Sequence, residues 1–490
     1  MDLPLTLFNQ GDRYKTRQAK VLGRFDGKRY QGLDLGPVLY DYVSSRVTED
    51  VAGPGRGLGF VLRFLRGMAT YVLTGRLVAD LARRPTLTLL NSRCDSPKGQ
   101  VWVRMDHSRK TVETQLTNII GGSPYVALEY DLHGRAAGVG FLRRLLRYAS
   151  LFPRCFVPFA SDPFGSIHKL AVQALAAGEI AAEARRLMAE GRPSAVFVYR
   201  DFPSISNTLV QVAHAAGIPA YSTQHAIHPQ FSGDYRRAGN GVFENSHASV
   251  YIAWGEFSKR QMADYDQRHH RDRRLLLDAR PTAPEERQID MDKDSTERIE
   301  VGEIVVSLMG LRHEAENVAL LKIVAQFAEG RGHSIRVRPH PSLDFRKYEA
   351  FLSDLGVAAE LTDSRATAQW RYTPHALGVT GLTSTYYENL FFGIPVLLFD
   401  YGYTVVEPLP RVFPGFKTVE ELAAQVETVE AMTRAEWYAK ADPICVEVYS
   451  RPCLDFEPRE SMIDLVRRDA GLLSEEPSPS RATAAVTGKR

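Results

Sequence analysis

GEIVVSLMG, residues 302–310, opens the stretch of sequence that decides the fold. This apolar, strand-like run precedes ENVALLKIVAQFAEG (316–330), in which apolar residues recur at the helical spacings of three and four. A second strand pattern, HSIRVRPHP (333–341), comes next, and a later one, HALGVTG (375–381), runs into another helix. Because strands and helices alternate, the stretch predicts a parallel sheet covered by helices.

The first half of the chain repeats this alternation. A helix pattern at 206–217, closed by Gly217, separates the last two strand patterns there. We therefore predict an α/β fold of two Rossmann-like, doubly wound domains facing a cleft, with ligands beyond the carboxyl ends of the strands. The strand patterns of the first half are PTLTLLNSR (85–93), PYVALEY (124–130), SAVFVYRD (194–201) and PAYSTQH (219–225).

Composition places the domain boundaries. The stretch 280–300 is rich in proline and charge and poor in apolar residues, so it reads as a linker. We predict an N-terminal Rossmann-like domain with helical insertions (1–279), a C-terminal Rossmann-like domain (301–425), C-terminal helices (426–470) and a disordered, low-complexity tail (471–490).

Charge and cysteine content narrow the class of protein. Among 490 residues, Lys and Arg number 61 and Asp and Glu 58, and this net charge of +3 is too small to indicate nucleic acid as a partner. The four cysteines form no CxxC pair, which predicts reduced thiols in a cytoplasmic protein. The N-terminus does not read as a secretory signal, and no apolar run has the roughly 20 residues needed to span a bilayer.

The segment 380–395, TGLTSTYYENLFFGIP, places three hydroxyl residues, Thr383, Ser384 and Thr385, where a strand passes into a helix. Free N–H groups and the helix dipole at such a terminus can bind phosphate. Glu388 follows on the same helix, where its carboxylate could accept from ribose hydroxyls. The alternative is an ordinary N-cap on an amphipathic helix.

His340 stands between Pro339 and Pro341 at the end of a strand pattern. The two prolines stop the strand and fix the backbone, so the imidazole is held at a carboxyl end, close to Arg338. An imidazole there can donate to a phosphate oxygen or protonate a departing nucleotide. The alternative is a turn histidine that bonds only its neighbour. Gly310, where the preceding strand ends, is a further candidate for the cleft.

Together, RPHP and the later run of hydroxyls, Glu-bearing helix and GIPV resemble the donor domain of GT-B-fold glycosyltransferases of bacterial surface polysaccharides. The resemblance is to capsule Kdo transferases and bacterial sialyltransferases, which use cytidine-activated sugars, with CDP-glycerol polymer transferases as relatives. It implies that His340, Ser384 and Thr385 contact the donor phosphate, with Arg338 and Glu388 nearby. It also implies no catalytic metal and no cofactor besides the nucleotide sugar.

The first half offers the other side of the cleft. Gln224 and His225 end a strand pattern and resemble the QHG segment of capsule and teichoic-acid transferases, with Ala226 in place of glycine. Trp254 and Gly255 resemble a Trp-Gly pair of the same families, and we interpret them as structural, with a pocket wall as the alternative.

A transferase also needs a group that takes the acceptor proton. Asp201 follows a strong strand pattern and is our first candidate, although it could instead cap the next helix. Asp131 is second and His225 third. Asp131, with Glu129, lies at another expected strand end, and a plain loop is its alternative.

Two stretches, 57–84 and 139–154, interleave arginines with Leu, Phe and Tyr at helical spacing. That pattern suits a peripheral contact with the inner face of a membrane, or else core helices with snorkelling arginines. Our function hypothesis is transfer of a sugar, Kdo or another nonulosonate, from a CMP-linked donor to a surface polysaccharide or glycolipid. The alternatives are a UDP-GlcNAc 2-epimerase-like enzyme, whose helix typically opens with Ser-Gly-Gly, and an inactive GT-B scaffold in capsule assembly.

Overall fold

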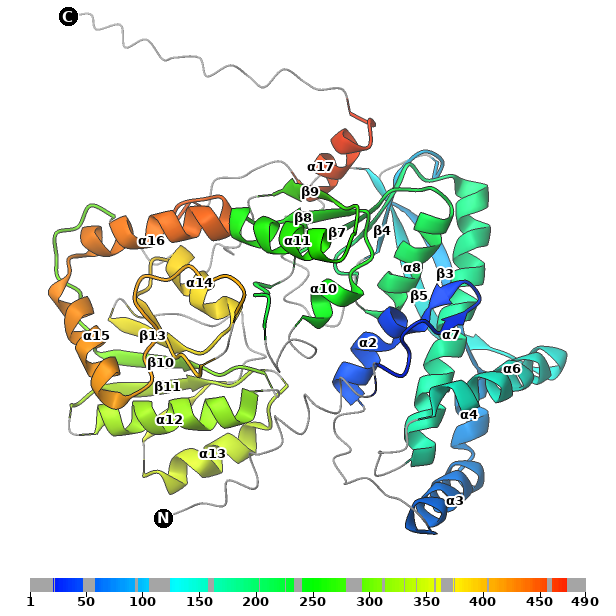
Figure 1. The fold of residues 1–490 in the computed structure, drawn as a ribbon, viewed down its shortest axis with the longest axis horizontal. Helices are drawn as coiled ribbons and strands as arrows, with labels where there is room; N and C mark the ends of the chain where they lie inside the picture. The colour runs from blue at the N-terminus through cyan, green and yellow to red at the C-terminus, as the bar shows by residue number, and fades with distance from the viewer. Residues whose placement is uncertain are drawn as a thin grey trace, which may run out of the picture.

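The computed structural model shows two lobes, each built around one larger sheet (Figure 1). The first sheet comes from the chain between residues 83 and 277, and the second from the chain between 303 and 398. The structure describes residues 21, 23–46, 58–92, 96–104, 124–156, 163–201, 203–224, 226–232, 240–278, 293–310, 313–329, 331–340, 342–356, 358–362, 373, 375–402, 405–455 and 461–473.

Within the described residues, the first sheet has seven strands, and all neighbouring pairs are parallel except the pair at one edge. In spatial order the strands are β3 (Arg83–Ser92), β5 (Tyr125–Arg135), β4 (Val101–Arg104), β6 (Ala195–Val198), β7 (Ala220–Thr223), β8 (Val250–Ala253) and β9 (Arg274–Leu277).

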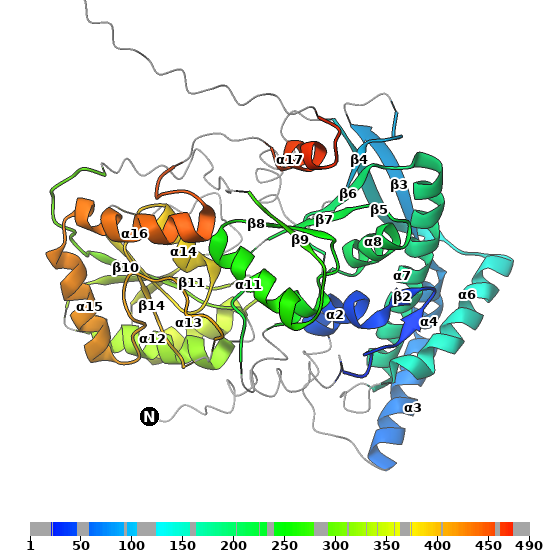
Figure 2. The same cartoon turned by 45° about the horizontal axis from the view of Figure 1, so that its top comes forward.

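The helices of the first lobe cover this sheet and extend from it as a separate helical group (Figures 1 and 2). A short antiparallel pair, β1 (Arg29–Tyr30) and β2 (Leu33–Asp34), precedes them. The helices are α2 (Leu35–Arg46), α3 (Leu58–Leu73), α4 (Arg76–Ala82), α6 (Gly138–Leu151), the 3-10 helix η2 (Phe152–Cys155), α7 (Pro163–Gly191), α8 (Ser204–Ala215), α10 (Gly241–Asn245) and α11 (Glu256–Arg268).

Strand β4 shows why its residues lie in the middle of the sheet. Its side chains alternate between the two faces, and both faces are covered. Trp102 packs toward α7, where Gly191 leaves room for the indole. Val101 and Val103 point to the other face. A strand buried on both sides carries apolar residues at every position, as VWVR nearly does.

Three features of this sheet differ from the sequence reading. β4 and β9 were not predicted as strands. β3 runs antiparallel to β5 at the sheet edge, although only parallel pairing was expected. β5 does not end at Tyr130 but continues to Arg135, because its pairing with β3 extends past the end of β4. The strand end expected at Asp131 is therefore wrong.

The second sheet has five strands among the described residues, and all of its neighbouring pairs are parallel. The chain starts in the centre, moves outward to one edge, and returns to the other side of its first strand. In spatial order the strands are β12 (Ala359–Leu361), β11 (Ser334–Arg338), β10 (Glu303–Ser307), β13 (Ala376–Thr380) and β14 (Val396–Leu398); the helices among them are α12 (Glu314–Ala328), α13 (Phe345–Asp354) and α14 (Ser384–Phe391).

Return to the other side of the first strand is the doubly wound arrangement, and its turning point lies between β10 and β13. The first sheet has a turning point as well, between β4 and β6, since β5 lies on the far side of β4. The predicted fold class, α/β with two Rossmann-like, doubly wound domains, is confirmed. The predicted domain boundaries themselves remain predictions, and most of the linker at 280–300 lies outside the described residues.

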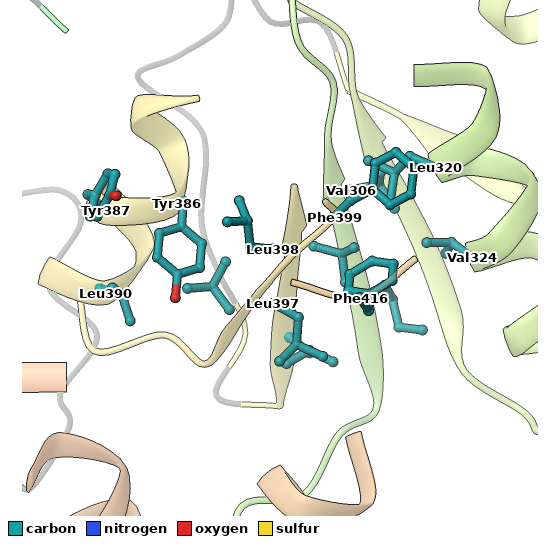
Figure 3. Packing of buried hydrophobic residues seen from close by; sticks show 14 of the residues in the cluster. Val306, Leu320, Val324, Tyr386, Tyr387, Leu390, Leu397, Leu398, Phe399 and Phe416 are labelled. Atoms are coloured by element: carbon teal, nitrogen blue, oxygen red, sulfur yellow. The ribbon is translucent and has the colours of Figure 1, made fainter. Parts of the chain in front are cut away.

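The core of the second lobe is continuous from the helix α12 across the sheet to α14 (Figure 3). Val306 of β10 lies with Leu320 of α12, and Leu390 of α14 belongs to the same core. Removing this apolar surface from water stabilises the lobe by about 25 cal/mol per Å², and the strand order needed for the site depends on it.

In the described part of the chain, the second sheet is followed by α15 (Val419–Ala431), which packs on α12, and then by α16 (Arg434–Tyr449) and α17 (Met462–Asp469), which lead back to the first lobe. α17 packs on the first sheet through Ile463 and Val466. Trp254, after β8, stacks on Tyr449 of α16, with ring centroids 5.7 Å apart.

Gly255 follows Trp254, and a Cβ there would lie 2.5 Å from backbone atoms of Glu447 and Val448. This position therefore needs glycine. The pair Trp254-Gly255 joins the two lobes, which is the structural role favoured by its sequence.

Candidate functional site

The donor-site candidates lie at the carboxyl edge of the second sheet, which is the side where its parallel strands end. Ser307 of β10 is level with Arg338 of β11 on one side and with Thr380 of β13 on the other. His340 and Thr383 therefore leave the sheet at the same edge, on opposite sides of the central strand, whose own continuation is Gly310. This is the turning point of the sheet, where doubly wound folds bind ligands.

The imidazole of His340 is exposed, and its orientation is set by Ser342. The backbone N–H of Ser342 donates to Nδ1 at 3.1 Å, and Oγ of the same residue lies 2.8 Å from Nδ1. Because Nδ1 accepts from a backbone amide, the proton of the neutral ring is on Nε2. Pro339 is buried, as expected for a residue that anchors the turn, whereas Pro341 lies outside the described residues.

Gly310 lies against this ring. A Cβ at Gly310 would be 3.5 Å from both Cε1 and Nδ1 of His340 and 3.5 Å from Oγ of Ser342. The sequence candidates His340 and Gly310 are thus neighbours in space. Arg338 is half-buried and level with the ends of β10 and β13, and its carbonyl accepts from the N–H of Leu308 at 2.9 Å.

Sequence reasoning missed the residue that holds the loop carrying Gly310. Asn317 of α12 is fully buried; its side chain accepts from the N–H of Met309 and donates to the carbonyl of Met309, both at 2.9 Å. A single amide in the apolar run ENVALL was the available signal, because a buried amide requires partners for both of its ends.

The hydroxyl cluster opens α14. Thr383 is the N-cap, and its side chain accepts from the N–H of Thr385 at 3.4 Å. Ser384 accepts at Oγ from the N–H of Ile227 in the first lobe, at 3.1 Å. The hydroxyl hydrogen of Ser384 can still be donated. Glu388 is half-buried one turn into the helix.

Contact between Ile227 and Ser384 brings the carboxyl edges of the two sheets together, since Ile227 follows β7 and Ser384 follows β13. The segment 226–232 makes further contacts with the second lobe: Phe231 forms a bridge with Val405, and the carbonyl of Gln230 accepts from the N–H of Val406 at 2.8 Å. The two edges that should flank a ligand are therefore joined by the bond from the N–H of Ile227 to Ser384 and by main-chain contacts of the segment 226–232.

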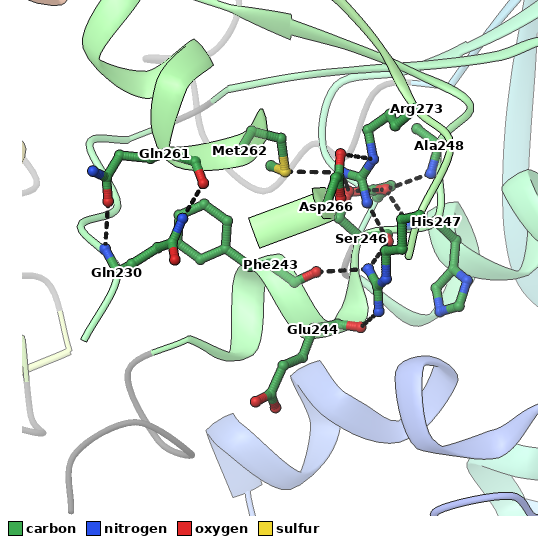
Figure 4. A network of polar contacts seen from close by, with 12 residues as sticks. Gln230, Phe243, Glu244, Ser246, His247, Ala248, Gln261, Met262, Asp266 and Arg273 are labelled. Atoms are coloured by element: carbon green, nitrogen blue, oxygen red, sulfur yellow. Dashed lines mark hydrogen bonds and ion pairs between the residues drawn. The ribbon is translucent and has the colours of Figure 1, made fainter. Parts of the chain in front are cut away.

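Asp201 follows β6 but is almost fully buried, at 2% exposure (Figure 4 shows the surrounding network). Its Oδ2 accepts from the hydroxyl of Ser246 at 2.7 Å and from the backbone N–H groups of His247 and Ala248 at 2.7 and 2.9 Å. It does not cap α8, whose N-cap is Pro203. The carboxylate instead fixes the loop that leads into β8, a structural role outside both sequence interpretations.

Charged neighbours extend this network. Arg273 donates to the hydroxyl of Ser246 at 2.7 Å and pairs with Asp266 at 3.4 Å (Figure 4). Burial lowers the pKa of His247 below the usual histidine value, and the Asp201 carboxylate opposes that shift. The histidine is therefore held neutral in this network at neutral pH.

The remaining candidates of the first lobe lie in different surroundings. Asp131 is exposed within β5, three residues beyond the level at which β4 ends. Glu129 pairs with Arg104 at 4.0 Å. Gln224 is buried; it accepts from the N–H of Trp254 at 2.8 Å and donates to Ser258 at 2.7 Å, so it fixes the strand ends. His225 lies outside the described residues.

No family model matches this chain, and no curated protein matches it. Among solved structures, it is similar to UDP-GlcNAc 2-epimerase from Neisseria meningitidis bound to UDP-GlcNAc, at 12% identity and TM-score 0.42 over 75% of this chain and 98% of that one. It is also similar to the wall teichoic acid polymerase TagF, at 11% identity and TM-score 0.37 over 85% of this chain and 99% of that one. A third similar structure is TarM, at 13% identity and TM-score 0.37 over 60% of this chain and 58% of that one. Such values describe a distant likeness in fold and nothing of substrate.

Proposed function

We propose that this chain is a nucleotide-sugar-dependent glycosyltransferase that binds its donor at the carboxyl edge of the second sheet. One observation carries the proposal: an oriented imidazole, His340, and the N-terminus of α14 leave the same edge on either side of the central strand. A nucleotide phosphate needs this combination of N–H donors and a fixed side-chain donor.

In the described part of the chain, three helices begin at this edge: α12, α13 and α14. The N-terminus of α13 is occupied by the carboxylate of its N-cap, Asp344, which accepts from the N–H of Arg346. The first turns of the other two helices differ in charge. α12 opens with the buried carboxylates Glu314 and Glu316, which occupy the positive end of its dipole. α14 has no acid in its first turn and opens with hydroxyls at Thr383, Ser384 and Thr385. A phosphate is repelled by the first terminus and attracted by the second. This contrast supports α14 as the phosphate-binding helix.

In this proposal the ring of His340 donates from Nε2 to a phosphate oxygen. The guanidinium of Arg338, two residues earlier, adds a positive charge that favours the developing negative charge of the leaving nucleotide. Glu388, one turn along α14, is placed to accept from ribose hydroxyls. Cationic and dipolar groups of this kind stabilise a departing phosphate without a metal ion.

The proposed sugar is a CMP-linked nonulosonate such as Kdo, and the proposed acceptor is a surface polysaccharide or glycolipid. The RPHP and hydroxyl motifs support this choice through their resemblance to transferases that use cytidine-activated sugars. For the acceptor proton, Asp131 is the better placed of the two described carboxylates, since its side chain is exposed beyond the end of β4 whereas Asp201 is engaged by three donors.

A thermal-shift titration with CMP, CDP, UDP and GDP tests the donor site, because a ligand that binds only the folded state raises its melting temperature. We expect CMP and CDP to stabilise the wild type, and His340→Ala to weaken that effect at least tenfold in nucleotide concentration, roughly the loss of one charge-assisted hydrogen bond. His375→Ala is the matched control, since His375 precedes β13 at the opposite edge of the same sheet.

Two results would count against the proposal. Stabilisation by UDP alone rejects the cytidine-linked donor and favours an epimerase-like enzyme or another transferase. Equal nucleotide binding by wild type, His340→Ala and a variant lacking the cluster, Ser384→Ala/Thr385→Ala, removes this edge of the sheet as the donor site.

A further inference from the structure

The helical group of the first lobe exposes an unusual amount of apolar surface. Helix α3 uses only one narrow face for packing: Phe64 contacts Phe152 and Phe164, and Tyr71 contacts His168. The rest of the helix is open to solvent, with Leu62 at 58% exposure. The other large apolar side chains exposed on α3 are Val61, Leu65, Met68, Val72 and Leu73.

Helix α6, which like α3 packs against α4 and α7, repeats this pattern. Its packing face consists of Arg144, Tyr148 and Leu151, which are buried, whereas Leu146 is 64% exposed. Val139, Leu142 and Leu145 are exposed as well. Both helices contact α7. The ring of Phe60 on α3 packs against the ring of Phe156, just beyond η2, with ring centroids 5.9 Å apart. In Figures 1 and 2 this group lies at the end of the first lobe away from the second sheet.

Buried polar contacts hold the group in place. His168 of α7 is fully buried and lies 2.9 Å from the hydroxyl of Tyr148 on α6 and 3.1 Å from the carboxylate of Asp80 on α4. Arg144 pairs with Glu179 of α7 at 2.7 Å. These polar contacts fix α4 and α6 to α7, and α3 is held to α7 by the aromatic contacts of Phe64 and Tyr71, so the exposed leucines belong to preformed helical faces. Exposed apolar patches of this kind mark interaction sites.

The charges on this surface select its partner. The sequences of α3 and α6 contain no acidic residue, and the exposed arginines among the leucines are Arg63, Arg66, Arg143 and Arg147. A second copy of the chain that used the same face in a symmetric dimer would bring these arginines against one another, which costs free energy when no carboxylate faces them. An anionic, apolar-cored layer satisfies both features, since arginines meet phosphates while leucines enter the acyl boundary.

We propose that α3 and α6 form a docking surface for an anionic lipid bilayer. The helices lie on the bilayer rather than cross it; within the part of the chain that the structure describes, no helix is long and apolar enough to span one. The inference goes beyond the proposed function and does not depend on it, because neither helix carries a residue of the donor site.

Cosedimentation of the full chain with vesicles, without nucleotide, tests this surface. We expect binding to vesicles of phosphatidylcholine with phosphatidylglycerol, and little binding to phosphatidylcholine alone. Each arginine near an anionic surface is worth about a fivefold change in partitioning, so Arg63→Gln/Arg143→Gln should weaken binding roughly 20- to 30-fold. Leu62→Asp/Leu146→Asp should weaken it on the order of 100-fold or more, since it removes apolar burial and adds repulsion.

Matched controls separate this surface from general charge and hydrophobicity. Lys322→Gln/Lys440→Gln removes the same number of positive charges from exposed side chains of the second lobe. Val446→Asp replaces an apolar side chain of α16, 47% exposed, by an acidic one. Both should bind vesicles like the wild type.

Three outcomes overturn the proposal: no binding of the wild type to anionic vesicles, equal binding by the leucine variant, or a dimer in light scattering that Leu62→Asp/Leu146→Asp converts to a monomer. The last result would assign the surface to a second copy. Circular dichroism melting checks that the variants are folded, and nucleotide thermal shifts report separately on the donor site.

Discussion

Replacing Asp201 by alanine should destabilise the first lobe rather than act on chemistry alone. Oδ2 of Asp201 accepts from the hydroxyl of Ser246 and from the N–H groups of His247 and Ala248, all within 2.9 Å. Asp201→Ala leaves these buried donors without an acceptor, and each costs about 1–3 kcal/mol. Because contributions from one group are not additive, we expect a total loss of about 3–5 kcal/mol.

Thermal unfolding followed by circular dichroism measures this loss. For a lobe of this size, about 2–4 °C per kcal/mol converts the estimate to a fall in melting temperature on the order of 10 °C. Asp201→Asn keeps one oxygen acceptor, so it should lose only about 1–2 kcal/mol. Asp272→Ala, at an exposed aspartate just before β9, is the control and should melt like the wild type.

One result would refute the structural role of Asp201. If Asp201→Ala melts within a degree or two of the wild type and yet abolishes turnover, the hydrogen-bond reasoning is wrong and Asp201 is the catalytic carboxylate. Asp131→Asn completes the comparison: it should leave the melting temperature and nucleotide binding unchanged and lower kcat, because its exposed side chain is no part of the core.

Two further predictions concern the lobe contact and the loop before β8. Gly255→Ala should lower the free energy of unfolding by about 1–3 kcal/mol, because its Cβ would lie 2.5 Å from backbone atoms of Val448. Gly59→Ala in α3 is the control and should not lower it, because a Cβ there meets nothing within 4 Å. Equal urea midpoints for the two variants would contradict this prediction. The pKa of His247 is lowered by burial, so below pH 6.5 the unfolded chain binds a proton that the folded chain resists, and stability falls as pH falls. His247→Gln should flatten urea-unfolding stability between pH 6.5 and 5 relative to the wild type, and unchanged slopes would rule out His247 as the source.

The fold was largely readable from the sequence because its strands carry periodic, apolar patterns of ordinary length. The runs at 302–310 and 333–341 became the central strands of the second sheet, and the helix between them was read from its apolar spacing. β4 was missed because its apolar run, Val101–Val103, is isolated between polar stretches. The course of β5 past Tyr130 depends on pairing with β3, which is 33 or more residues away along the chain. Long-range pairing of this kind leaves no local signal.

The positions of the candidate residues could be predicted where the backbone decides them, but the partners of their side chains could not. His340 and Thr383 could be placed at one sheet edge because both follow strands of a doubly wound sheet. The engagement of Asp201 by residues 246–248 could not be foreseen, since those donors come from a loop 45 or more positions later. Residues that follow strands are thus predictable in place, whereas the direction of their side chains depends on distant segments.

Ser384 shows how this distinction bears on mechanism. The sequence placed every donor-binding group in the second lobe, yet Oγ of Ser384 accepts from the N–H of Ile227 in the first. A phosphate at the N-terminus of α14 would receive the hydrogen of that same hydroxyl, and an oxygen that donates to an anion becomes a better acceptor for the Ile227 amide. Binding of the donor should therefore strengthen a contact between the lobes rather than compete with it. By linkage, a firmer lobe contact must raise donor affinity by the same factor.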